Sequence, residues 1–246
     1  MSDFEGLTAI VTGGASGIGA ATVAELQRRG ARVAIIDRAA STDAETPMVR
    51  ADLGSADEVQ AAVEQIARDF GGIDVLINNA GIGAAGDVTA NDDAEWHRVL
   101  DINVVGTARV TRAALPWLRR SSASSIVNTA SVTATNGLPN RALYSASKGA
   151  VIAMTYAMAA DHLADGIRVN AIAPGTADTP WVKRIVDSAD DAEVAAENLR
   201  RRQPLGRLVS AAELAFAIAN LASPLAGSTT GTVLTVDGGL STLRVG

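Results

Sequence analysis

The sequence predicts an α/β protein built on a doubly wound parallel sheet with helices on both faces. Short runs of β-branched and apolar residues alternate with longer helical patterns along the chain. The first run leads directly into a glycine-rich turn and a helix, as in doubly wound folds. The run at 73–77 is continuously apolar, as expected of a strand covered on both faces. Because α/β folds of 246 residues commonly have one core, we expect residues 1–246 to form a single domain.

Composition excludes several classes of protein. The net charge of −6 argues against a protein that coats nucleic acid or an anionic membrane. The chain has no cysteine, and Asp3 and Glu5 stand where a secretory signal needs positive charge, so we expect a cytoplasmic protein. The longest apolar stretch, 149–160, is too short for a membrane span. His97 and His162 are far apart, and no metal site is expected.

A glycine-rich turn joins the first predicted strand, 7–12, to the first predicted helix, 20–29. Gly13, Gly17 and Gly19 are spaced as G-x-x-x-G-x-G. Glycines permit a sharp turn and let backbone N–H groups at the helix N-terminus approach a pyrophosphate, which the helix dipole also favours. The turn therefore indicates a dinucleotide cradle with altered spacing. A tight turn that only stabilises the start of the helix is the alternative.

The second predicted strand, 32–36, is followed by Asp37, eighteen residues after Gly19. A carboxylate at this point can accept both ribose hydroxyls of the adenosine half and repels the additional phosphate of NADP. We therefore expect NAD as the cofactor. Arg38 could pair with that phosphate, so NADP stays open, and Asp37 could also merely cap a turn.

Two further predicted strands lead into residues of a nucleotide site. The third strand, 49–53, contains Asp52 and Leu53, and Leu53 could form the floor of an adenine site. The strand at 73–77 ends in Asn-Asn-Ala-Gly at 78–81. These two amides could hold neighbouring backbone together or line the cofactor groove, and the first use is favoured.

The segment 92–118 is predicted to be one long helix or two joined helices, with Asn103 inside it. An amide in an apolar helix is usually a core group with satisfied hydrogen bonds. The next strand, 126–129, places Ser131 just beyond its carboxyl end, where ligands gather in doubly wound sheets. Considered alone, Ser131 would be a turn serine.

A tyrosine thirteen residues after Ser131 precedes a lysine by four positions. Tyr144 and Lys148 therefore share one helix face, which brings a phenol beside an ammonium group. A phenol with a pKa of about 10 is a poor base at neutral pH, and a close positive charge lowers that pKa. Tyr144 is thus a candidate proton shuttle. Only two of the 21 basic residues are lysines, which favours a specific need for an ammonium at 148 over an ordinary surface lysine.

The last third of the chain continues the alternation. The helix that holds the tyrosine has an apolar face wide enough to need a cover, and strands are predicted at 167–172 and 232–236. The polar segment 176–203 lies between them and contains Trp181. Its length and polarity suggest a substrate lid over the strand ends, and a surface helical insertion is the alternative.

Together, these motifs resemble the short-chain dehydrogenase/reductase family. They are TGGASGIG at 12–19, NNAG at 78–81, Asn103, Ser131, YSASK at 144–148 and PGTADTP at 174–180, in the family's order. The resemblance runs from about residue 7 to residue 239 and implies a single Rossmann-type domain with a seven-stranded parallel sheet. It also implies hydride transfer between a nicotinamide cofactor and an alcohol or ketone. A tetramer formed through the helices at 92–118 and 148–163 is a further implication.

The resemblance implies roles for particular residues. Tyr144 looks like the catalytic acid/base, and Lys148 like the neighbour that lowers its pKa and holds the nicotinamide ribose. Ser131 would polarise the substrate oxygen. Asn103 would hold a water in the proton relay, which reverses its interpretation as a core amide. The implied cofactor residues are Gly13, Ser16, Gly17, Ile18, Gly19, Asp37, Asp52, Leu53, Asn79, Ala80, Gly81, Tyr144, Lys148, Pro174, Gly175 and Thr179.

The substrate is predicted less directly. Arg141 precedes Tyr144 by three residues, where a guanidinium could bind a carboxylate in bidentate fashion; a plain surface arginine is the alternative. The runs NRALYSASK and PGTADTPW are similar to those of members acting on hydroxy acids or deoxy-sugar acids. We therefore expect a small, polar, carboxylated secondary alcohol, with Trp181 as a second contact. An NADPH-dependent 3-oxoacyl thioester reductase and a dinucleotide sensor without turnover stay open.

Overall fold

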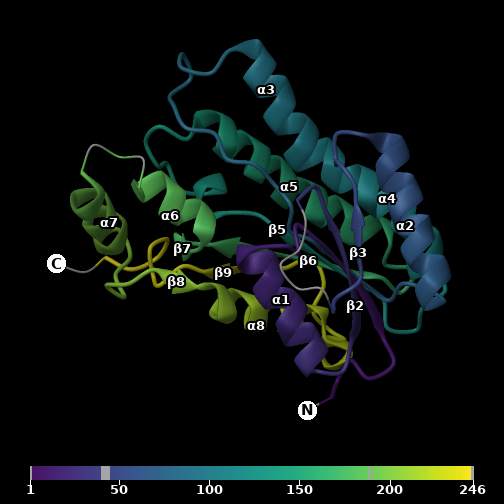
Figure 1. Ribbon diagram of the computed structural model, residues 1–246. Helices are drawn as coiled ribbons and strands as arrows, with labels where there is room; N and C mark the ends of the chain where they lie inside the picture. Colours follow the sequence, from purple (N-terminus) through teal and green to yellow (C-terminus); the bar gives the residue numbers. More distant parts are fainter. Residues whose placement is uncertain (1, 40–44, 188, 190, 245–246) are drawn as a thin grey trace.

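A seven-stranded parallel sheet forms the centre of the computed structural model, which describes residues 2–39, 45–187, 189 and 191–244 (Figure 1). The strand order is β3-β2-β1-β4-β5-β6-β9, so the direction of progression reverses between β1 and β4. The strands are β1 (Thr8–Thr12), β2 (Arg32–Asp37), β3 (Met48–Arg50), β4 (Val75–Asn78), β5 (Ser125–Thr129), β6 (Arg168–Pro174) and β9 (Val233–Val236). The predicted Rossmann-type architecture is confirmed. Ligands bind beyond the carboxyl ends of the strands at such a reversal point.

Two helical layers cover the sheet. On one face lie α1 (Gly17–Arg28) and α8 (Ala211–Ala222), which pack against each other (Figure 1). The other face is covered by α2 (Ala56–Phe70), α4 (Gly106–Leu118) and α5 (Ala142–Asp161). The prediction of helices on both faces is therefore confirmed.

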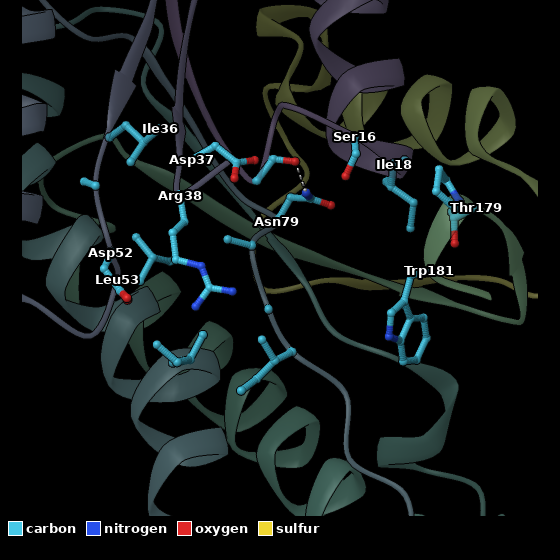
Figure 2. A pocket seen from close by; sticks show the side chains of 18 of the residues that line it. Ser16, Ile18, Ile36, Asp37, Arg38, Asp52, Leu53, Asn79, Thr179 and Trp181 are labelled. Carbon is cyan, nitrogen blue, oxygen red and sulfur yellow. Dashed lines mark hydrogen bonds between the residues drawn. The ribbon is translucent and has the colours of Figure 1, made fainter. Parts of the chain in front are cut away.

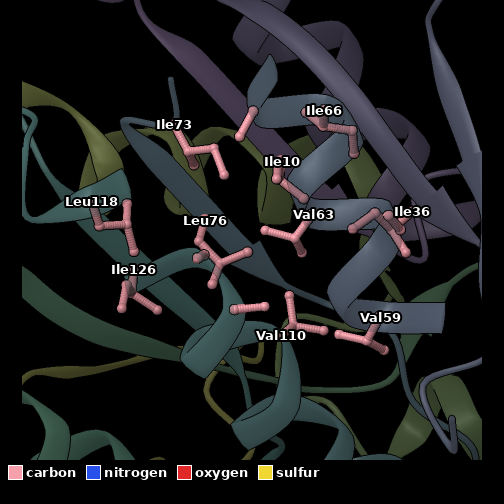
Figure 3. Close-up of a cluster of buried hydrophobic side chains, with 14 of the residues drawn as sticks. Ile10, Ile36, Val59, Val63, Ile66, Ile73, Leu76, Val110, Leu118 and Ile126 are labelled. Carbon is pink, nitrogen blue, oxygen red and sulfur yellow. The ribbon is translucent and has the colours of Figure 1, made fainter. Parts of the chain in front are cut away.

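Each strand supplies side chains to both layers, which explains why the strands are continuously apolar. In β1, Ile10 packs with Val63 of α2 and Val110 of α4, as Figure 3 shows. Its neighbours Ala9 and Val11 belong to the core under α1 and α8. Each large aliphatic side chain buried in this way stabilises the fold by about 1.5–3 kcal/mol relative to exposure.

The third strand is shorter than predicted. Asp52 and Leu53, expected inside it, follow β3 in a turn in which the Asp52 Oδ1 accepts a hydrogen bond from the Gly54 N–H (2.8 Å). An aspartate that bonds to the backbone two residues ahead favours a turn over a strand. The turn then leads into α2, which Ser55 caps by accepting from the Glu58 N–H.

The segment predicted as one or two helices is continuous. It consists of α3 (Asp93–Leu100), a π-helical stretch at Asp101–Val105, and α4. The π-helical stretch contains Asn103 and forms a single wider turn between the two α-helices.

The predicted lid segment contains two short helices beside the carboxyl ends of β5 and β6. They are α6 (Pro180–Asp187) and α7 (Ala192–Arg201), preceded by β7 (Ala177–Asp178), which pairs with β8 (Val209–Ser210). Residues 188 and 190 of the segment lie outside the described residues. Figure 1 shows α6 and α7 projecting from the side of the sheet opposite α2.

Large apolar side chains remain exposed on two surfaces. Val105, Tyr156 and Leu163 are exposed along the helices of one face, and Phe216 and Leu234 on α8 and the edge strand β9. Exposed apolar side chains that gather in patches mark interaction surfaces. Among the described helices, none combines the length and apolarity that a bilayer crossing requires.

Candidate active site

The turn between β1 and α1 is closed to side chains. Gly13 has a φ of 67°, and a Cβ there would lie 2.9 Å from the Cα of Ala80. A Cβ on Gly19 would lie 2.0 Å from the Gly13 carbonyl oxygen. Ser16, the residue before α1, makes no side-chain hydrogen bond to the helix end, so this helix N-terminus presents backbone N–H groups. Only glycine fits at positions 13 and 19, as a backbone cradle for an anionic group requires.

A cavity of about 460 Å³ opens beside this turn, and we call it the cradle cavity (Figure 2). The predicted residues that line it are Gly13, Ser16, Gly17, Ile18, Asp37, Asp52, Leu53, Asn79, Ala80, Gly81, Thr179 and Trp181. They come from the carboxyl ends of β1, β2 and β4, from the turn after β3 and from the start of α6. The structure therefore brings together predicted cofactor residues that are up to 166 positions apart in the sequence (Gly13 to Thr179).

Asp37 ends β2 at the edge of the cradle cavity. Its Oδ2 accepts from the Ala15 N–H (3.1 Å) and its Oδ1 from the Ala39 N–H (2.9 Å). It thus caps a turn, as the alternative interpretation held, and also faces the cavity. Figure 2 shows the Arg38 side chain extending into the same space. Arg98, which sequence reasoning missed, lines this cavity from α3.

The two amides at the carboxyl end of β4, Asn78 and Asn79, connect neighbouring segments. The Nδ2 of Asn79 donates to the Thr12 oxygen (3.1 Å) and to the Gly13 oxygen (3.3 Å), which confirms the favoured backbone-holding use. The Nδ2 of Asn78 instead donates to two side chains, Thr111 Oγ1 and Asn128 Oδ1. The Gly-rich turn is therefore fixed against β4 by Asn79, which also lines the cavity.

A second cavity, of about 480 Å³, continues from the first, and we call it the tyrosine cavity. The predicted residues on it are Ile18, Asn79, Gly81, Ser131, Arg141, Tyr144, Lys148, Pro174, Gly175, Thr179 and Trp181. Ile18, Asn79, Gly81, Thr179 and Trp181 also line the cradle cavity, so the two cavities form one groove. The predicted catalytic and cofactor residues thus meet along the carboxyl edge of the sheet, except for Asn103 and Gly19, which line neither cavity.

Lys148 lies beneath Tyr144 on α5, as the four-residue spacing predicts. Its Nζ lies 5.8 Å from the centre of the Tyr144 ring and donates to the Thr129 carbonyl at the end of β5 (2.8 Å). The lysine is only 5% exposed. Burial lowers the pKa of Lys148 to about 8, so the side chain remains largely charged at neutral pH.

The predicted lowering of the Tyr144 pKa is wrong as a net effect. Burial raises the pKa of Tyr144 to about 12, although the residue keeps part of its surface on the cavity. The neighbouring Ser131 hydroxyl and the positive charge of Arg141 act in the opposite direction without overcoming burial. The sequence argument considered only the nearby ammonium and omitted the free energy of removing a phenolate from water.

Ser131 serves the turn and also lies on the tyrosine cavity. Its Oγ accepts from the Thr133 N–H (3.2 Å) and from Thr133 Oγ1 (3.1 Å), which caps a short 3₁₀ helix at Val132–Ala134. It is 7% exposed and stands close enough to Tyr144 to affect the phenol's pKa. Ser131, Tyr144 and Lys148 therefore form one cluster on β5 and α5.

The side chain of Asn103 makes three hydrogen bonds within the protein. Its Nδ2 donates to the Ile82 oxygen (2.9 Å) and to Ser147 Oγ (3.0 Å), while its Oδ1 accepts from the Ile82 N–H (2.8 Å). An amide nitrogen has two N–H groups, and both are used. Both side-chain donors are therefore used within the protein, while Oδ1 accepts one of the two hydrogen bonds open to it, so the relay role that the resemblance implies stays a prediction. The side chain fixes the chain after β4 to α5.

The outer wall of the tyrosine cavity comes from the segment 176–203. The Trp181 ring lies 6.4 Å from the Tyr144 ring, centre to centre, and covers Gly83, where a Cβ would approach it to 2.3 Å. Arg184 and Arg202, which sequence reasoning missed, also line the cavity. The segment is rich in arginine, but the sequence alone carries no signal for which arginines face inward.

Arg141 faces the same cavity from the start of α5. One of its guanidinium N–H groups donates to the Ala84 carbonyl (3.2 Å), and its charge lowers the Tyr144 pKa. It is therefore not a plain surface arginine.

Comparison with known proteins agrees with this geometry. A family model described as enoyl-(acyl carrier protein) reductase matches residues 13–241. The chain is 41% identical to a cis-4-hydroxycyclohexanecarboxylate dehydrogenase of Sinomonas cyclohexanicum, over 94% of this chain and 95% of that protein. It is 38% identical to a 2,5-dichloro-2,5-cyclohexadiene-1,4-diol dehydrogenase of Sphingobium indicum, over 99% and 100% of the two chains. The ligand-free aldohexose dehydrogenase of Thermoplasma acidophilum superposes with a TM-score of 0.94 at 35% identity, over 99% and 97%.

Proposed function

The chain belongs to the short-chain dehydrogenase/reductase family, and we propose that it is an NAD-dependent dehydrogenase of a small polar hydroxy acid or a sugar-derived secondary alcohol. The coarser assignment, an oxidoreductase of this family that acts on an alcohol or ketone, follows from the relatives. One observation carries the finer proposal: Ser131, Tyr144 and Lys148 line a cavity that continues into the glycine cradle.

The cradle fits a dinucleotide because side chains are excluded at Gly13 and Gly19 while the N-terminus of α1 faces the cavity. Gly13, Ser16, Gly17, Ile18 and Gly19 would hold the pyrophosphate and its ribose, and Asp37 the adenosine ribose. Asp52 and Leu53 would flank the adenine, Asn79, Ala80 and Gly81 the adjacent groove, and Pro174, Gly175 and Thr179 the nicotinamide end. When bound, the nicotinamide ring supplies the hydride acceptor for oxidation of the alcohol.

The chain's own residues handle the proton. The Tyr144 phenolate accepts the proton of the substrate hydroxyl while the carbon–hydrogen bond at the same carbon breaks and the carbonyl forms. Ser131 holds the substrate oxygen, and the Lys148 ammonium stabilises the phenolate through its charge. With the pKa of Tyr144 raised to about 12, little phenolate exists at neutral pH, so oxidation is favoured by alkaline conditions.

NAD is proposed over NADP because of Asp37. Two backbone N–H groups, from Ala15 and Ala39, orient its carboxylate at the cavity edge. A fixed negative charge there repels the additional phosphate of NADP. We expect Asp37→Ser to raise the ratio of kcat/KM with NADP to that with NAD by roughly 100-fold, in line with loss of a close charge repulsion. An unchanged ratio would contradict this role.

The substrate proposal rests on the relatives and on the cavity. Two of the relatives act, by name, on a hydroxylated cyclohexanecarboxylate and on a cyclohexadiene diol. The tyrosine cavity offers the flat Trp181 ring on one side and the Arg141 guanidinium on another. A cyclic secondary alcohol that carries a carboxylate, such as 4-hydroxycyclohexanecarboxylate, fits a cavity with a flat aromatic wall and positive charge.

A second candidate is an NADPH-dependent reductase of 3-oxoacyl thioesters. The Arg38 side chain in the cradle cavity favours it, because a guanidinium there can pair with the NADP phosphate. Asp37 argues against it.

The assembly and location are also proposals. Exposed apolar residues on two surfaces, including Tyr156 and Phe216, support a homotetramer. The absence of cysteine from the sequence supports the cytoplasm, and the net charge of −6 supports the absence of nucleic-acid or membrane partners.

The proposed function is tested by a panel of secondary alcohols and hydroxy acids assayed with NAD and with NADP. We expect NAD-dependent oxidation of cyclic hydroxy acids. Turnover of 3-oxoacyl thioesters with NADPH alone would favour the second candidate. Binding of NAD without turnover of any panel member would favour a dinucleotide sensor.

A further inference from the structure

The tyrosine cavity is strongly cationic. Among the described residues, four basic side chains line it, Arg141, Lys148, Arg184 and Arg202, and no aspartate or glutamate does. This imbalance occurs in a chain whose acidic residues outnumber its basic ones, 27 to 21. A cavity with this charge favours an anionic ligand.

Two of the four cations are already engaged by the protein. The Lys148 Nζ donates to the Thr129 carbonyl and lies beside the Tyr144 ring. One Arg141 nitrogen donates to the Ala84 carbonyl, and its charge acts on the phenol. These two cations therefore belong to the acid–base cluster.

Arg184 and Arg202 are different. Within residues 2–39, 45–187, 189 and 191–244, neither makes an ion pair or a side-chain hydrogen bond, whereas Arg200 and Arg201 both pair with Glu197 (2.9 Å each). We propose that Arg184 and Arg202 form a binding site for the substrate's carboxylate on the outer wall of the tyrosine cavity. This inference rests on the proposed function and names the substrate feature that the cavity selects.

The elements that carry the two arginines direct them to a common space. Arg184 follows Trp181 by three residues on α6, so the two side chains lie on the same side of the helix. Arg202 is the C-cap residue of α7 and precedes Gln203, which is 1% exposed and donates from Nε2 to the Thr176 carbonyl (3.2 Å). The backbone at Arg202 is thereby anchored to the start of the segment beside the cavity.

Position along α6 also determines which acids fit. Trp181 already lies against Tyr144, with 6.4 Å between ring centres, and three helical residues add about 4.5 Å along the axis. The anion site therefore includes Arg184 on the turn of α6 that follows the tryptophan, and not the turn whose ring contacts Tyr144. A carboxylate on the carbon next to the hydroxyl stays close to the phenol, whereas one across a six-membered ring reaches this site. The geometry selects a hydroxy acid whose two groups are separated.

The electrostatics support the same site. Two like charges on one wall repel each other, and an anion between them removes this repulsion while accepting charge-assisted hydrogen bonds from both guanidinium groups. A carboxylate that bridges α6 to the end of α7 also holds the two short helices together over the substrate.

The first test compares a substrate with its neutral analogue. Steady-state kinetics are measured for 4-hydroxycyclohexanecarboxylate and its primary amide with wild type, Arg184→Gln and Arg202→Gln. We expect each variant to raise KM for the acid roughly tenfold, which corresponds to loss of one charge-assisted hydrogen bond, with kcat and the amide kinetics little changed. Equal effects on acid and amide would overturn the proposal.

Matched controls come from the neighbouring residues. Lys183→Gln and Arg201→Gln each remove one positive charge from the same helices without changing the cavity lining. We expect both to retain the wild-type KM for the acid within about twofold. A tenfold increase in these controls would mean that net charge, and not a site, governs the effect.

A binding measurement separates this inference from the proposed function. Calorimetry compares cyclohexanecarboxylate, which lacks the reacting hydroxyl, with cyclohexanecarboxamide. We expect wild type to bind the carboxylate about tenfold more tightly and Arg184→Gln or Arg202→Gln to lose this preference. Such a result in a protein that oxidises no alcohol would retain the anion site and refute the proposed function. Equal affinity of wild type for the two compounds, or a preference that only Arg141→Gln removes, would overturn the anion site.

Discussion

The two walls of the tyrosine cavity are built in opposite ways. The inner wall, β5 and α5, carries Ser131 and Lys148, which are 7% and 5% exposed and lie on elements packed into the core. The outer wall, α6 and α7, carries Arg184 and Arg202, which are exposed and belong to short helices. Acid–base chemistry requires groups held in fixed relative positions, whereas a specificity contact can sit on a segment that moves to admit the substrate.

This difference separates the expected consequences of mutation. Changes on the inner wall should reduce turnover of every substrate, because every substrate uses the same proton acceptor. Changes on the outer wall should affect KM and depend on the substrate's charge.

The largest effect is expected from Lys148→Met. This variant removes the charge beside Tyr144 and the hydrogen bond to the Thr129 carbonyl. We expect kcat to fall by roughly 1,000-fold for acid and neutral substrates alike, within the range of acid–base contributions. Steady-state assays with both substrate types check this. A loss confined to the acid would place Lys148 with the outer wall and contradict the comparison.

The next largest effect is the pH dependence of alcohol oxidation, which residues of the inner wall alone should control. The pKa of Tyr144 is raised to about 12, so its phenolate fraction grows with pH below that value, and oxidation should accelerate about tenfold per pH unit between roughly pH 6 and pH 8. Reduction of the ketone, which uses the protonated phenol, should be nearly constant there. Because the pKa of Lys148 is lowered to about 8, the ammonium stays mostly charged up to roughly pH 7 and is half neutral at pH 8, where the acceleration should weaken.

Variants on the two walls test which wall controls this pH dependence. Arg141→Gln removes a charge that lowers the Tyr144 pKa, so the pKa should rise and oxidation at any given pH should be slower. Arg184→Gln should keep the wild-type dependence of kcat on pH. A shift of the profile by Arg184→Gln would mean that the outer wall also tunes the phenol.

Stability should depend on pH through Lys148. Burial lowers its pKa from 10.5 to about 8, so between these values the unfolded chain binds more protons and stability rises with pH. Below about pH 8 the full penalty of the buried ammonium is present. The free energy of unfolding of wild type relative to Lys148→Met should therefore increase by on the order of 2–3 kcal/mol from pH 8 to pH 10.5, as denaturant titrations can measure.

A control for this linkage is Lys183→Met, because Lys183 is exposed on α6. The Tyr144 pKa, raised from 10.0 to about 12, makes stability fall with pH above 10, but it does so in wild type and both variants and cancels in the differences. The same pH-dependent difference in Lys183→Met would show that it does not come from the inner wall.

The smallest effect is expected from Trp181→Leu. The ring is 42% exposed and contributes apolar contact near Tyr144 without a hydrogen bond to the substrate's charge. We expect KM to rise about threefold for acid and amide alike, in line with partial loss of apolar contact area. A selective effect on the acid would place the tryptophan in the anion site.

Much of the inner wall was predictable because its chemistry follows regular spacing. Tyr144 and Lys148 lie one helical turn apart, and Ser131 follows a strand whose carboxyl end was evident from its apolar run. The pKa of Tyr144 was not predictable in the same way. Its direction depends on burial by segments distant in sequence, which outweighs the local charges.

The outer wall shows what the sequence pattern does not predict, namely which side chains face the cavity. The segment 176–203 contains two helices, but which of its arginines face the cavity depends on how these short helices pack on each other and beside β7. Asn103 illustrates the same limit inside the core. Its side chain bonds to Ile82 and Ser147 because a π-helical stretch turns it toward them, and no spacing rule predicts that stretch.

The central claim is that the Tyr144 phenolate accepts the substrate proton, in a groove that binds NAD whether or not this oxygen is present. Its most direct test is Tyr144→Phe, which removes one oxygen and keeps the ring. NAD affinity, measured by calorimetry, should stay within about threefold of wild type while oxidation falls by at least 1,000-fold. Substantial oxidation by this variant, with NAD still bound, would contradict the account.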